Sequence, residues 1–140
     1  MLGRNTYTKE EVTHAKSAIV AQLEAYKALL KGVGGAAADK KAVAAFEPLF
    51  FNNLLLALDR PFVHRVRAVA GKDGNPLNEV ELICASIMDD DGILTKSTVI
   101  KLVPEQSVLG IQFGESIRLS QQQFEQLSAA FFAELEAKFR

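Results

Sequence analysis

Apolar residues recur every three or four positions in the first quarter of the chain, which is the period of one face of an α-helix. Thr8 and Glu11 have the spacing of a capping box, in which two side chains bond free backbone N–H groups of the first turn. Glycines begin at Gly32 and end the pattern. The sequence therefore predicts a long amphipathic helix that ends at about Lys31. Its apolar stripe contains Val12, Ala15, Ile19, Leu23, Tyr26 and Leu30.

The region after this helix predicts a connection and two further helices. Residues 32–38 are small and have no helical period, so we expect a mobile Gly/Ala-rich connection there. A short helix then ends at Phe46. Pro48 disfavours helical geometry at Glu47, and a break is expected between them. The helix from Pro48 to about Asp59 is apolar on nearly every side, which is typical of a helix in the middle of a core.

The next segment predicts a helical hairpin. Apolar positions over residues 62–70 fit one helical face, and the stretch from Gly71 to Gly74 is typical of a turn. Asn75 and Pro76 have the character of an N-cap and a first helical residue. The second helix of the hairpin has one apolar face, made of Leu77, Val80, Ile83, Cys84, Ile87 and Met88.

β-Branched residues become frequent in the region 94–119. The runs 98–103 and 115–119 have the composition of strands and are separated by a proline and two glycines. We expect them to pair in an antiparallel manner, with residues 108–113 as a third short strand. The region therefore predicts a small antiparallel sheet.

Ser120 and Gln123 form a second capping-box pair and predict a final helix, whose apolar stripe runs from Phe124 to Phe139. Together the patterns predict one α+β domain over residues 1–140, mainly α. Its core is expected to be a helical bundle of about five helices, with the small sheet placed before the C-terminal helix.

Composition and charge narrow the functional classes. The chain has 140 residues and a net charge of −1, which gives no electrostatic reason to bind nucleic acid or an anionic membrane. Its first residues lack the apolar run of a signal peptide, and the apolar run 54–58 is far too short to span a bilayer. Cys84 is the only cysteine, so no intrachain disulfide can form. We therefore expect a cytoplasmic protein that binds neither nucleic acid nor membrane.

Motifs for metals and cofactors are not matched. Cys84, His14 and His64 are the whole Cys and His supply, which is too scattered for a zinc site. The glycines from Gly32 fit a loose dinucleotide pattern, but a predicted helix rather than a strand precedes them. Cys84 and His64 could form a thiolate–imidazole pair, yet their helical phases differ, and a buried inert thiol is favoured. We expect no cofactor and no metal.

Polar residues between positions 60 and 79 form the strongest candidate for a binding site. Arg60, His64 and Arg67 recur at spacings of four and three, which predicts a basic ridge on a helix. The turn that follows lies near a predicted helix N-terminus, where backbone N–H groups favour anions. A small anion or an acidic partner could bind here, or the residues could form a solvated face with a well-capped turn. The turn contributes Lys72, Asn75, Asn78 and Glu79.

A resemblance to known sequences appears in the same region. The stretch from Leu58 to Arg67 reads LDRPFVHRVR, and the stretch from Gly71 to Val80 reads GKDGNPLNEV. Together with FFNN at residues 50–53 and FFAELE at 131–136, these runs resemble a family of small bacterial proteins of unknown function. The resemblance covers most of the chain beyond Ala45. It implies a bacterial cytoplasmic protein and brings no activity or ligand.

Two functions are therefore predicted as alternatives. The favoured one is a non-enzymatic protein that acts through protein contacts and forms a homodimer, because the stripe of the first helix must be covered by its own domain or by a second copy. The alternative is a small enzyme or a protein that binds an anion or small ligand. It would use the Arg60–His64–Arg67 ridge and the turn 71–79, with a concave pocket that converges on His64 and Asn75.

Overall fold

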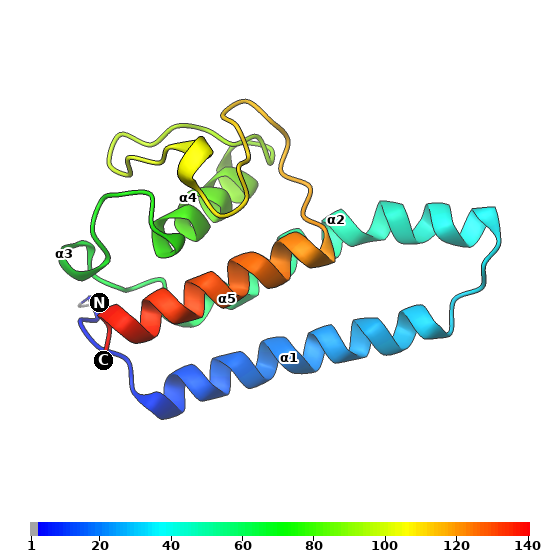
Figure 1. Cartoon of the computed structure of the whole chain (residues 1–140), viewed down its shortest axis with the longest axis horizontal. Helices are drawn as coiled ribbons and strands as arrows, with labels where there is room; N and C mark the ends of the chain where they lie inside the picture. Colours follow the sequence, from blue (N-terminus) through cyan, green and yellow to red (C-terminus); the bar gives the residue numbers. More distant parts are fainter. Residues whose placement is uncertain (1–2) are drawn as a thin grey trace.

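The computed structural model describes residues 3–140 and is mainly helical, as the sequence predicts (Figure 1). Five α-helices follow one another along the chain, and two short 3-10 helices connect them. The α-helices are α1 Lys9–Lys31, α2 Ala37–Asp59, α3 Arg67–Ala70, α4 Pro76–Asp89 and α5 Gln121–Lys138, and the 3-10 helices are η1 Arg60–Phe62 and η2 Pro104–Gln106.

Three of the helix starts that the sequence predicts, those with a capping side chain at Thr8, Asn75 and Ser120, are confirmed. Thr8 and Glu11 form a complete capping box at α1, with 3.1 Å between each side-chain oxygen and the backbone nitrogen that it bonds. Ser120 and Gln123 do the same at α5. Asn75 caps α4 by accepting hydrogen bonds from two N–H groups of the first turn. These motifs involve residues within three positions of one another, so local sequence is sufficient to predict them.

The predicted break at Pro48 is wrong, because α2 continues through it. A proline inside a helix removes one backbone hydrogen bond and crowds the preceding turn. Contacts with α1 hold the two halves of α2 in line. The ring of Tyr26 stacks on Phe46, before the proline, and on Phe50, after it, with centroid distances of 6.3 and 5.2 Å. The connection between α1 and α2 comprises residues 32–36 and is shorter than the predicted range 32–38, because α2 already begins at Ala37.

The predicted helix over residues 62–70 is also wrong. The chain forms η1, a turn and the four-residue helix α3, with Val66 in an extended conformation. The N-terminal segment pairs here: Arg4 donates its N–H to the His64 carbonyl at 2.7 Å, and Val66 donates to the Arg4 carbonyl at 3.0 Å. A bridge to a distant segment thus replaces the helical hydrogen bonds.

The predicted antiparallel sheet is not present, since residues 3–140 contain no strand. The region 94–119 makes isolated bridges, including an antiparallel one between Ile93 and Ser116. Helix side chains satisfy its backbone instead. The Asn52 amide of α2 donates to the Ile117 carbonyl at 2.8 Å and accepts from Leu119 N–H at 3.1 Å. The domain is therefore helical with a long irregular segment.

Aromatic and aliphatic residues from α2, α4 and α5 make the core, and α1 covers one side of it (Figure 1). Three fully buried phenylalanines, Phe51, Phe124 and Phe131, come from α2 and α5. The stripe of α1 packs inward, so its bulky residues are covered by the same chain. The buried members of the stripe are Val12, Ala15, Ile19, Leu23 and Tyr26.

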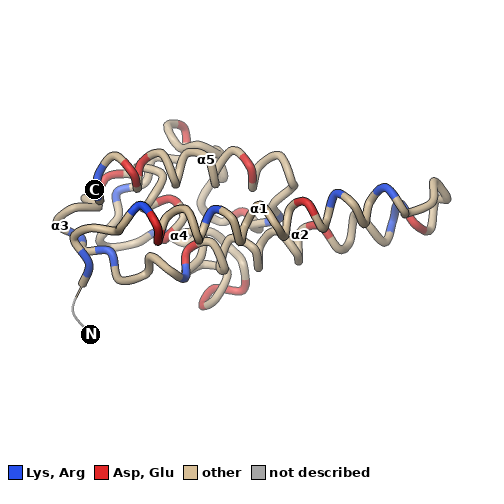
Figure 2. The backbone as a smooth tube through the Cα atoms, turned by 90° about the horizontal axis from the view of Figure 1, so that it is seen from below, with Lys and Arg blue, Asp and Glu red and all other residues tan. Residues whose placement is uncertain are grey.

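The end of α1 and the start of α2 extend beyond the other helices as a two-helix projection (Figures 1 and 2). The segment Ala37–Phe62 is long and apolar enough to cross a membrane by length and composition, with a mean hydropathy of 1.3. The core helix of a soluble protein can have the same length and hydropathy. Only 28% of the most apolar stretch of this segment is buried, however. The predicted central helix, Pro48 to about Asp59, places Leu54, Leu55 and Leu58 in the core, whereas Leu49 and Asn53 on its other side are exposed.

Candidate functional site

Several of the polar residues that the sequence predicts as a ligand site are buried, and their side chains hydrogen-bond the backbone of the turn before α4 and of nearby segments. Asn78 and Glu79 are buried, with exposed fractions of 0% and 2%. The Asn78 amide donates to the carbonyls of Gly71 at 3.0 Å and Asp73 at 2.7 Å. Asn75 caps α4 and donates to the Ala70 carbonyl at 2.8 Å. These amides are used in folding the turn.

Glu79 connects α4 to the irregular segment that follows it. Its two carboxylate oxygens accept the N–H groups of Val108 at 2.8 Å and Leu109 at 3.0 Å. Burial raises the pKa of the Glu79 carboxyl, and the two backbone hydrogen bonds act in the opposite direction. The predicted third strand at 108–113 therefore finds its hydrogen-bond partner in a helix side chain.

The predicted basic ridge is dispersed. Arg60 and His64 are exposed, whereas Arg67 turns back to donate to Asn78 Oδ1 at 2.8 Å and forms an ion pair with Glu81. Lys72 is exposed in the turn. Because residues 63–66 are not helical, the spacing of these cations does not place them on one face. The structure brings Arg67 and Asn75 to Asn78, which bonds both, whereas Arg60, His64 and Lys72 are exposed apart from this cluster.

Arg65, which the sequence analysis did not single out, is the buried cation of this region. Its guanidinium donates to Asp59 Oδ1 at 2.7 Å and to the carbonyls of Phe62 at 2.9 Å and Leu77 at 2.9 Å. Burial raises the pKa of the Asp59 carboxyl against the opposing effect of Arg65. The cluster ties the ends of α2 and η1 to α4. No short motif in the sequence distinguishes Arg65 from its exposed neighbours.

Cys84 is buried, and its sulfur lies 3.8 Å from the Leu55 carbonyl oxygen. Burial raises the pKa of the thiol, which keeps it protonated and unreactive. His64 is exposed at the surface, so the two do not face one another. Among residues 3–140, no group of three His, Cys, Asp or Glu side chains is placed to hold a metal.

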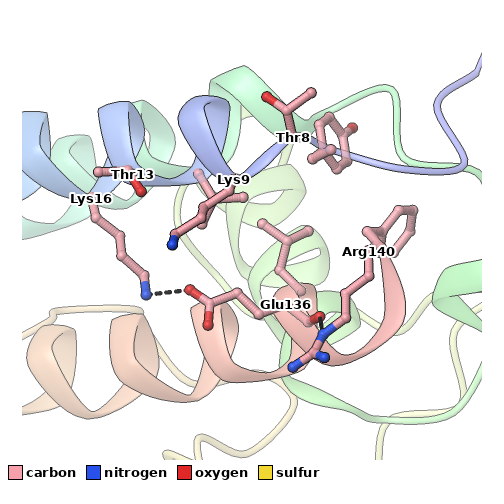
Figure 3. Close-up of a pocket in the computed structure, with 10 residues that line it drawn as sticks. Thr8, Lys9, Thr13, Lys16, Glu136 and Arg140 are labelled. Carbon is pink, nitrogen blue, oxygen red and sulfur yellow. Dashed lines mark hydrogen bonds and ion pairs between the residues drawn. The ribbon is translucent and has the colours of Figure 1, made fainter.

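A groove with a volume of about 620 Å³ lies between the first half of α1 and the end of α5 (Figure 3). Its floor is apolar and its rim is charged. Figure 3 shows Lys16 directed across the groove to Glu136, with which it forms an ion pair, and Arg140 beside the end of α5. The lining includes Val12, Leu135, Phe139, Lys9, Lys16 and Arg140.

A second candidate region lies on the two-helix projection, and we call it the distal hairpin surface. Its exposed apolar residues are Leu29, Val33, Phe46 and Leu49, and the partly buried Leu30, Val43 and Phe50 adjoin them. Leu49 is 66% exposed and Phe46 is 45% exposed. Between the helices is a recess of about 250 Å³, lined mainly by apolar side chains that include Tyr26 and Phe46. Contiguous apolar surface of this kind marks sites of interaction.

No protein-family model, curated protein or solved structure matches this sequence. The resemblance to small bacterial proteins therefore remains a prediction.

Proposed function

We propose that the protein is a non-enzymatic, cytoplasmic protein that acts through protein contacts and forms a homodimer through the distal hairpin surface. The observation that carries this proposal is the exposure of large apolar side chains on both helices of the projection. The stripe of α1 that first suggested a dimer is already buried within its own chain. The proposed interface therefore lies at the end of α1 and on α2 from its start to Phe50.

The composition of α2 favours a partner that is itself apolar. Between Ala42 and Leu58 the only charged residue is Glu47. The part of α2 in the projection has charged residues at positions 39–41 and 47 that can face water, but its exposed apolar residues have α1 alone beside them. A matching pair of helices would cover the remaining faces.

A second copy supplies such a pair. Two helical hairpins packed side by side form a four-helix bundle, in which side chains of one pair enter recesses of the other. The recess beside Tyr26 and Phe46 is suited to accept an apolar side chain from the second copy. A two-fold arrangement uses the same surface on both chains and is the commonest form of homodimer.

Sedimentation equilibrium of the full chain tests the proposal directly. The wild-type chain, with a monomer mass of 15.3 kDa, should sediment as a dimer at tens of micromolar. Leu49→Glu places a charge within the proposed interface, at its most exposed apolar position, and should yield the monomer. Met88→Glu is the matched control, because Met88 is 64% exposed on α4, outside the projection, and should leave the dimer intact.

Two results would contradict this interface. A wild-type chain that remains monomeric at 100 µM, on the order of one hundred times a micromolar dissociation constant, excludes a functional dimer. A Leu49→Glu variant that remains dimeric shows that another surface associates. If the wild-type monomer co-sediments with anionic lipid vesicles and Leu49→Glu does not, the apolar projection binds membrane, and the proposed protein contact is wrong.

A further inference from the structure

We propose that the groove between α1 and α5 binds a long-chain fatty acid. The acyl chain would lie along the seam of the two helices, and the carboxylate would lie at the rim near Lys9 and Arg140. This site is separate from the distal hairpin surface and does not depend on dimer formation. The proposal rests on the length, lining and charge of the groove.

The recess in Figure 3 continues along the seam into a second recess of about 450 Å³. Lys16 and Glu136 line both, so their ion pair crosses the middle of one continuous seam. Beyond that bridge the walls remain mostly apolar. They include Ile19, Val20 and Leu23 of α1 and Ala129, Phe132 and Ala133 of α5.

The seam is long enough for an extended acyl chain. From Lys9 to Leu23, α1 runs for about 20 Å at the helical rise per residue. The two acyl layers of a bilayer together span about 30 Å, so one long chain reaches about 15 Å. Each recess also falls within, or close to, the size range of ligand sites, on the order of 300–1,000 Å³.

The bridges that cross the seam are weak enough to part for a ligand. Lys16 pairs with Glu136, and Lys27 pairs with Glu125 at 3.4 Å. All four side chains are about two-fifths exposed. Ion pairs this exposed contribute little to stability, roughly 0–1 kcal/mol, because water screens them. Small α5 residues, Ala129 and Ala133, leave room beneath the bridges.

The rim carries an excess of positive charge. Lys9, Lys16 and Arg140 line the wide end of the groove, where Glu136 is the one acidic residue. Among residues 3–140, Lys9 has no ion-pair partner, and Arg140 uses only Nε, which donates to the Glu136 carbonyl at 2.9 Å. An anionic head group with an apolar tail matches this arrangement.

Displacement of a fluorescent fatty acid from the full chain tests the site. Dansyl-undecanoic acid should bind, and palmitate should displace it with a stoichiometry of one per chain. Acetate has the head group without the tail, and hexadecanol has the tail without the charge, so each should compete at least tenfold more weakly. The double variant Lys9→Glu/Arg140→Glu should weaken palmitate binding at least tenfold.

Matched variants separate the groove from other surfaces. Arg60→Glu/Lys72→Glu makes the same charge change at exposed cations outside the groove and should bind palmitate as the wild type does. Ala133→Trp fills the seam from an exposed α5 position and should weaken binding at least tenfold, with the circular dichroism spectrum unchanged. Leu49→Glu should retain binding whether or not the chain dimerises.

Three outcomes would overturn the proposal. The first is failure of palmitate to displace the probe. The second is wild-type affinity in both Lys9→Glu/Arg140→Glu and Ala133→Trp. The third is loss of binding in Leu49→Glu alone, which would place the lipid on the distal hairpin surface.

Discussion

The turn before α4 and the projecting hairpin use their side chains in opposite ways. Around the turn, polar side chains are the buried ones, and Asn78 and Glu79 are bonded to backbone groups. On the hairpin, apolar side chains are the exposed ones, and Leu49 and Phe46 lie at the surface. The polar-rich region resembles a binding site in sequence, and the apolar-rich region resembles a core.

The contrast shows that burial, and not residue type alone, decides whether a side chain is free to contact a partner. A buried polar group is costly unless it is hydrogen-bonded, so Asn78 and Glu79 are already committed to neighbours in the fold. An exposed apolar side chain leaves apolar surface that no residue of its own chain covers. The surface available for recognition is therefore on the hairpin and in the α1–α5 groove, and not at the turn.

The largest expected effect compares two leucines of α2. Leu55 is fully buried, whereas Leu49, which lies nearer to the projection, is exposed. Leu55→Ala should lower the free energy of unfolding by about 2–5 kcal/mol, because it leaves a cavity in a packed core. Leu49→Ala should change it by less than about 0.5 kcal/mol in the monomer. Urea denaturation at low protein concentration measures both, and similar losses for the two would mean that the hairpin end is packed.

An intermediate effect is expected at the turn. Asn78→Ala removes an amide that bonds the carbonyls of Gly71 and Asp73 and the Arg67 guanidinium, and it takes from the Asp73 carbonyl its buried side-chain donor. We expect a loss of about 1–3 kcal/mol in the free energy of unfolding. Asn53→Ala is the control, because Asn53 is exposed and bonds only the Leu49 carbonyl of its own helix. If Asn78→Ala is as mild as the control, the turn does not depend on its buried amide.

Sequence alone was sufficient for the elements whose signals are local. The capping residues Thr8, Asn75 and Ser120 each mark a helix start that the structure contains. The stripes of α1 and α5 were recognised from their period, and both are buried. Helical periodicity over many residues gives a signal that tertiary contacts seldom reverse.

The predictions that failed depend on distant partners. Tyr26 holds α2 straight across Pro48, and Glu79 takes the N–H groups that a strand would otherwise provide. Arg4 pairs with the segment around Arg65 and prevents a helix there. Each partner lies more than 20 residues away in the chain, so spacing rules could not identify it.

The candidate surfaces were recognisable only in part. The apolar character of α2 on every side was visible in the sequence, but its exposure was not, since that depends on where α5 and α4 end. The groove joins Lys9 to Arg140, residues from opposite ends of the chain. No linear pattern connects them.

The smallest expected effect concerns Tyr26, the aromatic residue where the projection meets the core. Its hydroxyl is buried and has no hydrogen-bond partner among residues 3–140. Tyr26→Phe keeps the ring and its stacking while it removes the unpaired hydroxyl. Near neutral pH we therefore expect the free energy of unfolding to change by less than about 0.5 kcal/mol, or to rise slightly. A loss above about 1 kcal/mol would show that the hydroxyl does have a partner in solution.

Alkaline pH should separate this variant from the wild type. Burial, together with the nearby Glu47 carboxylate, raises the pKa of Tyr26 to about 12, whereas in the unfolded chain tyrosine titrates near 10. Above pH 10 the unfolded state loses a proton that the folded state keeps, so the wild type should lose stability as the pH rises from about 10 to about 12. Tyr26→Phe lacks that proton and should lose less stability, because only the contributions of Tyr7 and of the buried Cys84 thiol, whose pKa values are also raised, are then left in common with the wild type. Urea denaturation at pH 9 and 11, with tyrosinate absorbance of the folded protein, measures the difference. Ionisation of Tyr26 near pH 10 in the folded protein would mean that the projection opens in solution, so that the boundary between core and hairpin lies deeper in α2.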